Sequence, residues 1–469
     1  MAQSEPLPAE PKPGPAVEPR TDSLYGLTTS LVKAVESALA DGNKARVREL
    51  IRPLHDSDLA DLIGRLTWHQ RLRLIDAAGS QFTGEVLAYL DESVREQVMR
   101  GLLPGEIAAA ISDLDSDDAV SVLQELGEPE RQEVLQALTS EDRADIEQSL
   151  SYPENSAGRL MQGAVVGLPA YWTAGQAIDH MREASALPDT FFEIYVVDER
   201  GGVQGVVSLS RLLRARRTGL LRDLMETDVK VIPATTDQEE VARVFEQYNL
   251  VAAPIVAENG RLIGVISADD VVAVIGAEAA EDVLKFSGVS GTDIYRDAIR
   301  TSSGRFTWLL VNLFTAILAS WVIYQFDASI EQMVGLAVLM PIVASMGGNA
   351  GTQIMAVAVR ALATRDLSGD NFVRVLLKET VVGAVNGVLF AVIVGAVAGL
   401  WYWDLPLGVV IGSAMVINLI SAGFFGLAIP FVLWRLKIDP ATSAGVFLTT
   451  VTDVVGFLAF LGLATMFLV

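Results

Sequence analysis

The C-terminal part of the chain, residues 305–469, consists mostly of long apolar segments separated by short polar ones. A helix needs roughly 20 apolar residues to cross a hydrocarbon core of about 30 Å. Each segment is long enough, so the pattern predicts an all-α transmembrane domain of five helices in contact with membrane lipid. The predicted spans lie near residues 306–325, 331–359, 374–400, 406–434 and 442–468.

Residues 24–150 show a different pattern, with apolar residues three and four positions apart and frequent turn or cap signals. Asp58–Ile63, Glu106–Ile111 and Asp118–Leu123 are examples. Short amphipathic helices in series predict an α-helical solenoid. Residues 1–23 precede this domain and form a proline-rich tail that we expect to be disordered.

Residues 151–275 contain a sequence that occurs twice. The run Val196–Ser208 matches Ile255–Ser267 at a displacement of 59 residues, and Leu168–Ala170 matches Ile232–Ala234. Each copy has two β-rich runs joined by a glycine turn and followed by a helix. The arrangement resembles a tandem pair of CBS modules, the regulatory units named after cystathionine β-synthase, and predicts an α+β domain.

A polar helix is expected from Ala268 to Ser287, ending at Gly288, and residues 268–304 would link the soluble and membrane domains. The chain is therefore predicted to be multidomain: solenoid, CBS pair, linking helix and transmembrane domain. The linking helix is rich in acids, namely Asp269, Asp270, Glu278, Glu281 and Asp282.

Charge is divided unevenly between the two halves. The whole chain carries a net charge of −23, whereas residues 301–469 hold seven basic and eight acidic side chains, so nearly all of the negative charge lies in residues 1–300. Such a surface repels nucleic acid and anionic lipid and attracts cations, although it could also serve only solubility. We therefore expect divalent cations, and not nucleic acid, as partners.

Several kinds of chemistry are missing from the sequence. There is no cysteine, and the three histidines, His55, His69 and His180, are far apart, which argues against a transition-metal cluster. No nucleophile–base pair or phosphate-cradling loop is recognisable. The protein is therefore not expected to be an enzyme.

The loop charges predict the orientation in the membrane. All seven basic residues of the C-terminal part lie before the first span, between the second and third, or between the fourth and fifth, whereas loops 326–332 and 401–406 have none. The positive-inside rule then places the N-terminus in the cytoplasm and the C-terminus outside. No apolar run follows the initiator Met, so no signal peptide is expected, and we expect a multi-pass protein of the inner (plasma) membrane.

One acid lies inside a predicted span. Asp453 follows Thr449, Thr450 and Thr452 in the fifth span and has no basic neighbour in the sequence. Because a charge in the bilayer is costly, such an acid is a functional candidate. The alternative is a structural acid held by the hydroxyls of Thr450 or Thr452. A carboxylate among hydroxyl and carbonyl oxygens suits a hard divalent cation.

The second span contains a glycine-rich polar segment, Gly347–Gln353. Glycines weaken a helix, and free carbonyl groups at this depth are tolerated only where they line a cavity. The alternative is close helix packing. Because Asn349 lies in the same turn, we expect a broken helix that lines a pore with Gly348, Asn349 and Thr352, opposite Asp453 and Thr449.

These motifs together resemble the MgtE family of magnesium channels and transporters. They are Pro341, Gly347–Gln353, Arg360–Asp366, Lys378–Glu379 and Asp439–Pro440 followed by Thr449, Thr450 and Asp453. The domain order also fits. The resemblance implies a homodimer with a pore on the dimer axis, built from the second and fifth spans, that transports Mg²⁺ and closes when cytoplasmic Mg²⁺ binds between the acidic domains.

The resemblance also implies a set of regulatory Mg²⁺ ligands. This sequence departs from the family at Ser121, Asn249 and Ala273, where relatives have acids, and at Thr352 and Gly445, where some have asparagine. Fewer sensor acids predict weaker gating by Mg²⁺. The implied sensor ligands are Asp117, Asp237, Glu239, Asp270, Glu278, Glu281 and Asp282.

Asp270 has a second interpretation. The segment Gly264–Asp270 resembles the ribose-binding signature of nucleotide-binding CBS modules, with Ser267 and Asp270 as ligands, whereas the first copy has Arg211 at the equivalent position. This allows one adenine nucleotide, such as ATP, per subunit. Two alternative functions remain open: a broader divalent (Mn²⁺, Co²⁺) or cation-coupled transporter, and a membrane-anchored CBS nucleotide sensor.

Overall fold

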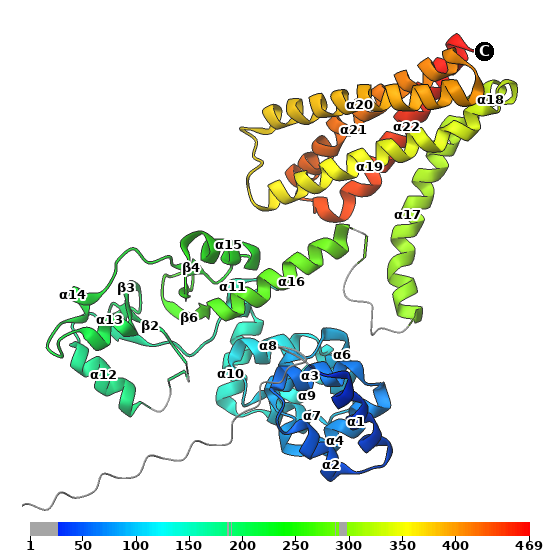
Figure 1. The fold of residues 1–469 in the computed structure, drawn as a ribbon. Coiled ribbons are helices and arrows are strands. Elements are labelled where there is room, and N and C mark those ends of the chain that lie inside the picture. Colours follow the sequence, from blue (N-terminus) through cyan, green and yellow to red (C-terminus); the bar gives the residue numbers. More distant parts are fainter. Residues whose placement is uncertain (1–26, 185–186, 189, 287, 290–297) are drawn as a thin grey trace, which may run out of the picture. The chain divides into compact units, whose positions relative to one another are not determined.

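The computed structural model describes residues 27–184, 187–188, 190–286, 288–289 and 298–469. The chain divides into two compact units between Ile275 and Gly276 (Figure 1). The first unit contains the helical N domain and the two CBS modules, and the second contains the end of the linking helix and the membrane domain. The proline-rich tail, Ser287 and most of the connection after Gly288 lie outside the described residues.

The N domain is built from short helices, as predicted. Polar caps define many of them: the side chains of Thr28, Asn43, Thr83 and Thr139 each accept a hydrogen bond from a backbone N–H of the first turn. Helices two places apart in the chain pack against each other, as in α3–α5, α5–α7 and α7–α9, which produces the expected stack. The helices are α1 (Thr29–Ala40), α2 (Lys44–Ile51), α3 (Asp56–Arg65), α4 (Trp68–Ala78), the 3₁₀ turn η1 (Gly79–Gln81), α5 (Gly84–Tyr89), α6 (Glu92–Met99), α7 (Pro104–Ile111), α8 (Ser116–Gln124), α9 (Glu128–Ala137) and α10 (Ser140–Leu150).

The two CBS modules confirm the internal duplication. Each has a three-stranded sheet whose first two strands are parallel and whose last two are antiparallel. The register shift at Val196/Val197 recurs at Ile255/Val256, and the turn glycines Gly201 and Gly260 have φ of 80° and 79°. The elements are α11 (Ala157–Leu160), β1 (Gly167–Pro169), α12 (Ala174–Glu183), β2 (Glu193–Val197), β3 (Val203–Ser208), α13 (Leu209–Arg214), α14 (Leu221–Leu224), β4 (Ile232–Pro233), α15 (Gln238–Tyr248), β5 (Ala252–Val256) and β6 (Leu262–Ser267).

The linking helix α16 runs from Ala268 to Phe286, and its predicted last residue, Ser287, lies outside the described residues. It begins directly after β6 of the second CBS module. Val271 and Val274 are buried in that module, whereas Val272, Ile275 and Val283 are exposed.

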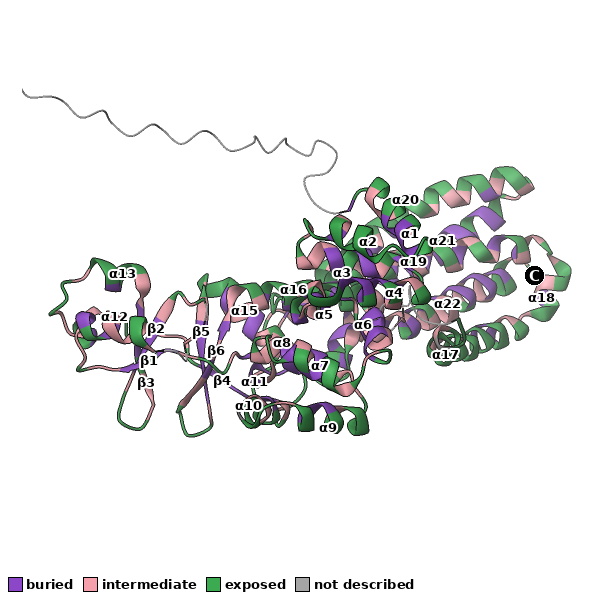
Figure 2. Ribbon diagram, turned by 90° about the horizontal axis from the view of Figure 1, so that it is seen from below, coloured by how far each residue is buried: buried purple, intermediate pink, exposed green. Residues whose placement is uncertain are grey.

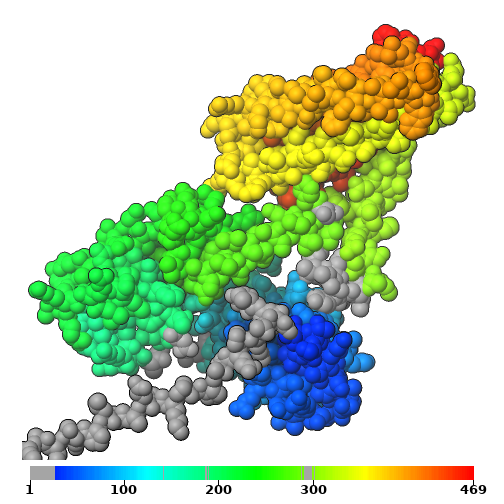
Figure 3. Space-filling view, in the orientation of Figure 1, coloured from blue at the N-terminus to red at the C-terminus, as the bar shows by residue number. Residues whose placement is uncertain are grey.

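The membrane domain contains the predicted helices. Five of its described helices are long and apolar enough to cross a membrane. Many large apolar residues of these helices are exposed, as expected for contact with lipid. Figure 2 shows exposed residues along these helices in green. On the face shown in Figure 3, α19 and α20 cover most of α22. The helices are α17 (Ala298–Tyr324), the short α18 (Asp327–Gln332), α19 (Gly335–Ala363), α20 (Phe372–Tyr402), α21 (Leu405–Arg435) and α22 (Pro440–Phe467).

The predicted break in the second span is wrong, because α19 is a continuous helix through Gly347–Gln353. Its glycines serve close packing instead. A Cβ atom on Gly347 would lie 2.3 Å from the Asn418 side chain of α21, and one on Gly351 would lie 3.1 Å from Leu448 of α22. The cost of glycine in a helix is therefore offset by helix contacts that a side chain would prevent.

Candidate ion pathway and acidic groups

The intramembrane acid Asp453 lies in the middle of α22, and it is half-buried. Among the described residues it has no hydrogen-bond or ion-pair partner, so neither Thr450 nor Thr452 holds it. Their hydroxyls donate to backbone carbonyls of α22 instead. One turn before Asp453, the exposed Thr449 donates to the Gly445 carbonyl oxygen over 3.0 Å. Asp453 is thus available to a ligand.

A second polar face lies on α19. Ser345, Asn349 and Thr352 are exposed and follow each other at helical spacing. The Asn349 amide donates to Ser345 Oγ over 3.4 Å, and Thr352 Oγ1 donates to the Gly348 carbonyl oxygen over 2.9 Å. The Thr352 hydroxyl oxygen keeps lone pairs that can accept a hydrogen bond or approach a cation.

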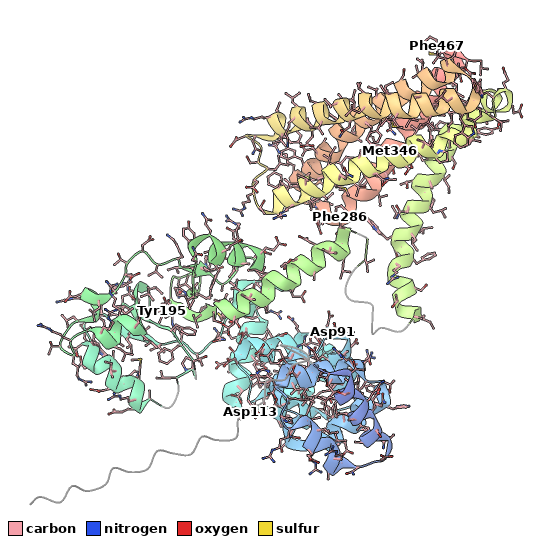
Figure 4. The ribbon with its side chains drawn as sticks, in the orientation of Figure 1. Asp91, Asp113, Tyr195, Phe286, Met346 and Phe467 are labelled. Carbon is pink, nitrogen blue, oxygen red and sulfur yellow. The ribbon has the colours of Figure 1, made fainter. Side chains whose placement is uncertain are left out.

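The helices that carry the two polar faces pack directly against each other. A Cβ atom on Gly456 of α22 would lie 3.2 Å from Val343 of α19, and Gly351 of α19 lies against Leu448 of α22. In Figure 4, Met346 marks the middle of α19. The predicted pore residues therefore lie on adjacent helices of one subunit.

The linking helix α16 ends against the membrane helices. Phe286 packs with Met355 of α19, Leu433 of α21, and Ala444 and Leu448 of α22 (Figure 4). The end of α16 thus contacts the three helices that carry or surround the predicted pathway.

An ion-pair network surrounds this contact. Lys285 Nζ lies 2.7 Å from Glu281 Oε1 and 3.5 Å from Asp439 Oδ2. Asp439 is the N-cap of α22 and accepts hydrogen bonds from the Ala441 N–H and the Thr442 hydroxyl. Desolvation, followed by the Asp439 charge, raises the pKa of Asp282.

Three of the predicted sensor acids lie on this part of α16. Glu278, Glu281 and Asp282 are three and four residues apart and so share one face of the helix. This face lies close to Asp439. Lys285 forms ion pairs with both Glu281 and Asp439, and the charge of Asp439 contributes to the raised pKa of Asp282.

Another carboxyl group cluster lies between α8 of the N domain and the start of α16. Asp117 shares a hydrogen bond with Asp270, and its Oδ1 is buried with no hydrogen-bond partner in the described part of the chain. Burial and then Asp270 raise the pKa of Asp117 well above its usual value. Burial, followed by Glu85, raises the pKa of Asp118 to about 6. Burial and neighbouring carboxyl groups therefore disfavour ionisation here.

Asp270 also forms local hydrogen bonds. Its Oδ2 accepts from the Ser267 N–H over 3.3 Å and from the Ser267 hydroxyl, and Gln162 Nε2 lies 3.5 Å away. Asp270 and Ser267 therefore lie together as the nucleotide hypothesis requires. In the first copy, Arg211 pairs instead with Glu226.

The remaining predicted sensor acids, Asp237 and Glu239, are exposed at the start of α15, where Asp237 caps the helix. The same helix ends at Asn249, whose backbone has a left-handed φ of 51°. Asparagine tolerates this conformation well, which gives a structural reason for its presence there. In the described residues, no three His, Cys, Asp or Glu side chains gather closely enough to hold a metal ion.

Four residues that sequence reasoning did not single out have clear roles in these contacts. Asp118 follows a predicted ligand directly, and Asp439 belongs to one of the motifs that carry the family resemblance. Lys285 is a cation among the acids of α16. Asn418 is an amide within the apolar fourth span, and this isolated polarity could have identified it.

Models of known families match the chain in three places. A divalent cation transporter model matches residues 340–463, an MgtE intracellular N domain model matches residues 54–155, and a CBS domain model matches residues 157–218 and 221–277. Together they cover the domains in the order in which the structure shows them.

Curated relatives match nearly the whole chain. The magnesium transporter MgtE of Bacillus subtilis is 30% identical over 440 residues, covering 93% of this chain and 97% of the relative. MgtE of Thermus thermophilus is 32% identical over 450 residues, covering 93% and 98%. The crystal structure of the cytosolic domain of the Mg²⁺ channel MgtE in complex with ATP is 30% identical, covers 52% of this chain and 99% of its own, and gives a TM-score of 0.49.

Proposed function

This chain belongs to the MgtE family of magnesium transporters, and we propose that it carries Mg²⁺ across the cell membrane through a pore that two copies of the chain form together. Its N-terminus would lie in the cytoplasm and its C-terminus outside, as the distribution of basic loops indicates. The protein would act as a transporter and not as an enzyme.

The polar faces of α19 and α22 carry this proposal. Asn349, Thr352 and Thr449 are exposed and Asp453 is half-buried on a single copy, in helices that would otherwise face lipid. Polar and charged groups in contact with hydrocarbon are costly. A second copy that covers these faces removes the cost and encloses a water-filled path between them.

The groups on this path suit Mg²⁺ that keeps much of its water. Mg²⁺ sheds water reluctantly and is usually held by one or two carboxylates through an otherwise hydrated shell. Asp453 would supply the charge, whereas Thr352 and Thr449 and the carbonyl oxygen of Gly348 would accept hydrogen bonds from the bound waters. Each copy offers one carboxylate, two hydroxyls and a carbonyl oxygen, and Mn²⁺ and Co²⁺ can also bind oxygen ligands. Competition of these two ions with Mg²⁺ for transport should therefore be measured.

We propose that cytoplasmic Mg²⁺ closes this path through the acids of the cytoplasmic half. Divalent cations would neutralise the acids of α16, together with Asp439, and the Asp117–Asp270 pair. Removal of this repulsion would stabilise the contact between Phe286 and the ends of α19 and α22. An adenine nucleotide at Ser267 and Asp270 would bind in direct competition with Mg²⁺ at Asp270.

Mg²⁺ uptake into proteoliposomes tests the pathway. D453N has nearly the same shape as the native side chain but lacks the charge, so we expect it to abolish uptake while folding and dimerisation are unchanged. D404N, which removes a carboxylate that caps α21, is the matched control and should retain uptake. Normal uptake by D453N would contradict the pathway, and coupling to opposing Na⁺ or H⁺ gradients would identify an exchanger.

A further inference from the structure

A single amide is buried where three membrane helices meet. Asn418 of α21 has none of its surface exposed, and its Nδ2 donates to the Val343 carbonyl oxygen of α19 over 2.8 Å. Exchanging the amide nitrogen and oxygen would place two oxygen acceptors at this distance, so the donor assignment follows from the contact. Asn418 Oδ1 is buried without a hydrogen-bond partner in the described residues.

Two glycines make room for this amide. A Cβ atom on Gly347 of α19 would lie 2.3 Å from Asn418 Nδ2, and a Cβ atom on Gly456 of α22 would lie 2.7 Å from the same nitrogen. Both distances are shorter than real Cβ contacts, so a side chain at either position would displace the Asn418 amide. Asn418 therefore occupies the space that the two glycines leave between the three helices.

Asn418 and the two glycines that it contacts lie next to the proposed ion path. Gly347 is followed directly by Gly348, and Gly456 lies three residues after Asp453, within one helical turn. Asn418 therefore contacts both helices close to the proposed path. It lies against α19 beside Gly348 and against α22 within one turn of Asp453.

An apolar side chain at position 418 would fill the space between the helices at a lower cost in free energy. An unpartnered buried amide oxygen is unfavourable, and apolar packing between membrane helices needs no polar group. Apolar packing, however, is not directional. A hydrogen bond to one carbonyl fixes both the rotation and the height of α21 relative to α19.

We propose that Asn418 is a positioning residue for Mg²⁺ passage, which sets the spacing between the Gly348–Thr352 face of α19 and Asp453 of α22. The inference rests on the proposed function, since it concerns the same path. It assigns discrimination between hydrated divalent ions of different size to a residue that does not touch the ion.

The test compares N418L, which keeps a similar volume without the hydrogen bond, with the wild-type protein in proteoliposomes. We expect N418L to remain a folded dimer and to lose selectivity for Mg²⁺ over Ca²⁺ by about five- to tenfold, the equivalent of one hydrogen bond between membrane helices. S413A, which removes only a hydroxyl that donates to Val409 within α21, should leave the ratio unchanged.

N418D allows a second measurement, the pH dependence of the Mg²⁺/Ca²⁺ ratio, which a purely structural role of Asn418 would not affect. A protonated carboxyl can donate to the Val343 carbonyl oxygen as the amide does, but a carboxylate cannot. We expect the Mg²⁺/Ca²⁺ ratio of N418D to approach the wild-type value at low pH and to fall as pH rises, measured relative to wild type at each pH. This variant also carries the test if N418L fails to assemble.

Unchanged flux and an unchanged Mg²⁺/Ca²⁺ ratio in N418L, or a ratio in N418D that rises toward the wild-type value as pH rises, would overturn the positioning role. Those results together with a loss of uptake in D453N would leave the proposed pathway intact. Uptake that survives in D453N would instead refute the pathway itself.

Discussion

At the scale of single residues, two adjacent glycines have different surroundings. Gly347 lies against Asn418, whereas nothing lies within 4 Å of the position where a Cβ atom on Gly348 would stand. Both occur in one helical turn and are indistinguishable in the sequence. Packing therefore explains Gly347, whereas the free space beside Gly348 is compatible with a path for the ion.

This difference predicts opposite effects of the same substitution. G347A should lower the free energy of unfolding by about 1–3 kcal/mol through overpacking. G348A should raise it by up to about 1 kcal/mol, because alanine favours the helix and meets no neighbour. Thermal unfolding in detergent measures both. Equal destabilisation by the two variants would contradict the packing described for α19.

A pH-dependent effect is expected at Asp118. Its pKa in the folded protein, about 6, is above the usual value of 3.8 for aspartate, so the fold favours the protonated form. Its contribution to stability is therefore present at low pH and is lost as pH rises from about 4 through 6. Above pH 7 the ionised Asp118 carboxylate should destabilise the contact between α8 and the start of α16 by on the order of 1–3 kcal/mol.

D118N removes this ionisation. Hydrogen exchange in α8 should be slower in D118N than in wild type at pH 7.5, and the two proteins should converge near pH 4. D113N, in the loop before α8, is the control. Faster exchange in D118N at pH 7.5 would show that the carboxylate is stabilised and not strained.

Spacing in the sequence was sufficient to predict which residues share a face, as for Thr449 and Asp453. It was not sufficient to predict what lies opposite them. The contact between Asn418 and Val343 joins positions 75 residues apart and depends on how two helices pack. The raised pKa of Asp118 likewise depends on burial and then on the charge of Glu85, which lies on another helix, α5.

At the scale of elements, α16 carries acids of the N-terminal half at one end and contacts the membrane helices at the other. Its first turn carries Asp270 beside Asp117, and its last turn carries Lys285 and Phe286 against the membrane domain. Lys285 supplies one positive charge to a helix face that would otherwise bring acids close to Asp439. It would therefore stabilise the docked helix even without a divalent cation.

Removing this charge should make closure depend more strongly on Mg²⁺. K285Q leaves Glu281 and Asp439 without their shared cation, so we expect higher Mg²⁺ flux at low cytoplasmic Mg²⁺ and a higher concentration for half-inhibition. K437Q, an equal change of charge at an exposed position in the α21–α22 connection, is the matched control. Identical inhibition curves for K285Q and wild type would exclude this role for Lys285.

Element type was largely predictable, because hydrophobic periodicity and the duplicated sequence depend on local residues. The five apolar helices and the repeated sheets were found where expected. The break predicted in α19 failed because glycines weaken a helix only when nothing compensates. Here neighbouring helices α21 and α22 pack onto Gly347 and Gly351, and these contacts could not be inferred from one segment alone.

At the scale of the whole molecule, the uneven charge has a consequence for regulation. Residues 1–300 carry nearly all of the net charge of −23, and no three acids of the described residues gather into a complete metal site. Pairs such as Asp117–Asp270 and the acidic face of α16 would hold Mg²⁺ weakly, with water completing the shell. Closure should therefore require free Mg²⁺ at concentrations well above those that saturate a full carboxylate site.

Regulated Mg²⁺ passage can be measured as Mg²⁺ flux through the full-length protein in liposomes, titrated with Mg²⁺ on the side of the N-terminal half. We predict measurable flux at low cytoplasmic Mg²⁺ that falls progressively as cytoplasmic Mg²⁺ rises, and no flux in D453N at any concentration. Absence of flux under all conditions, or flux that cytoplasmic Mg²⁺ does not change up to tens of millimolar, would contradict it.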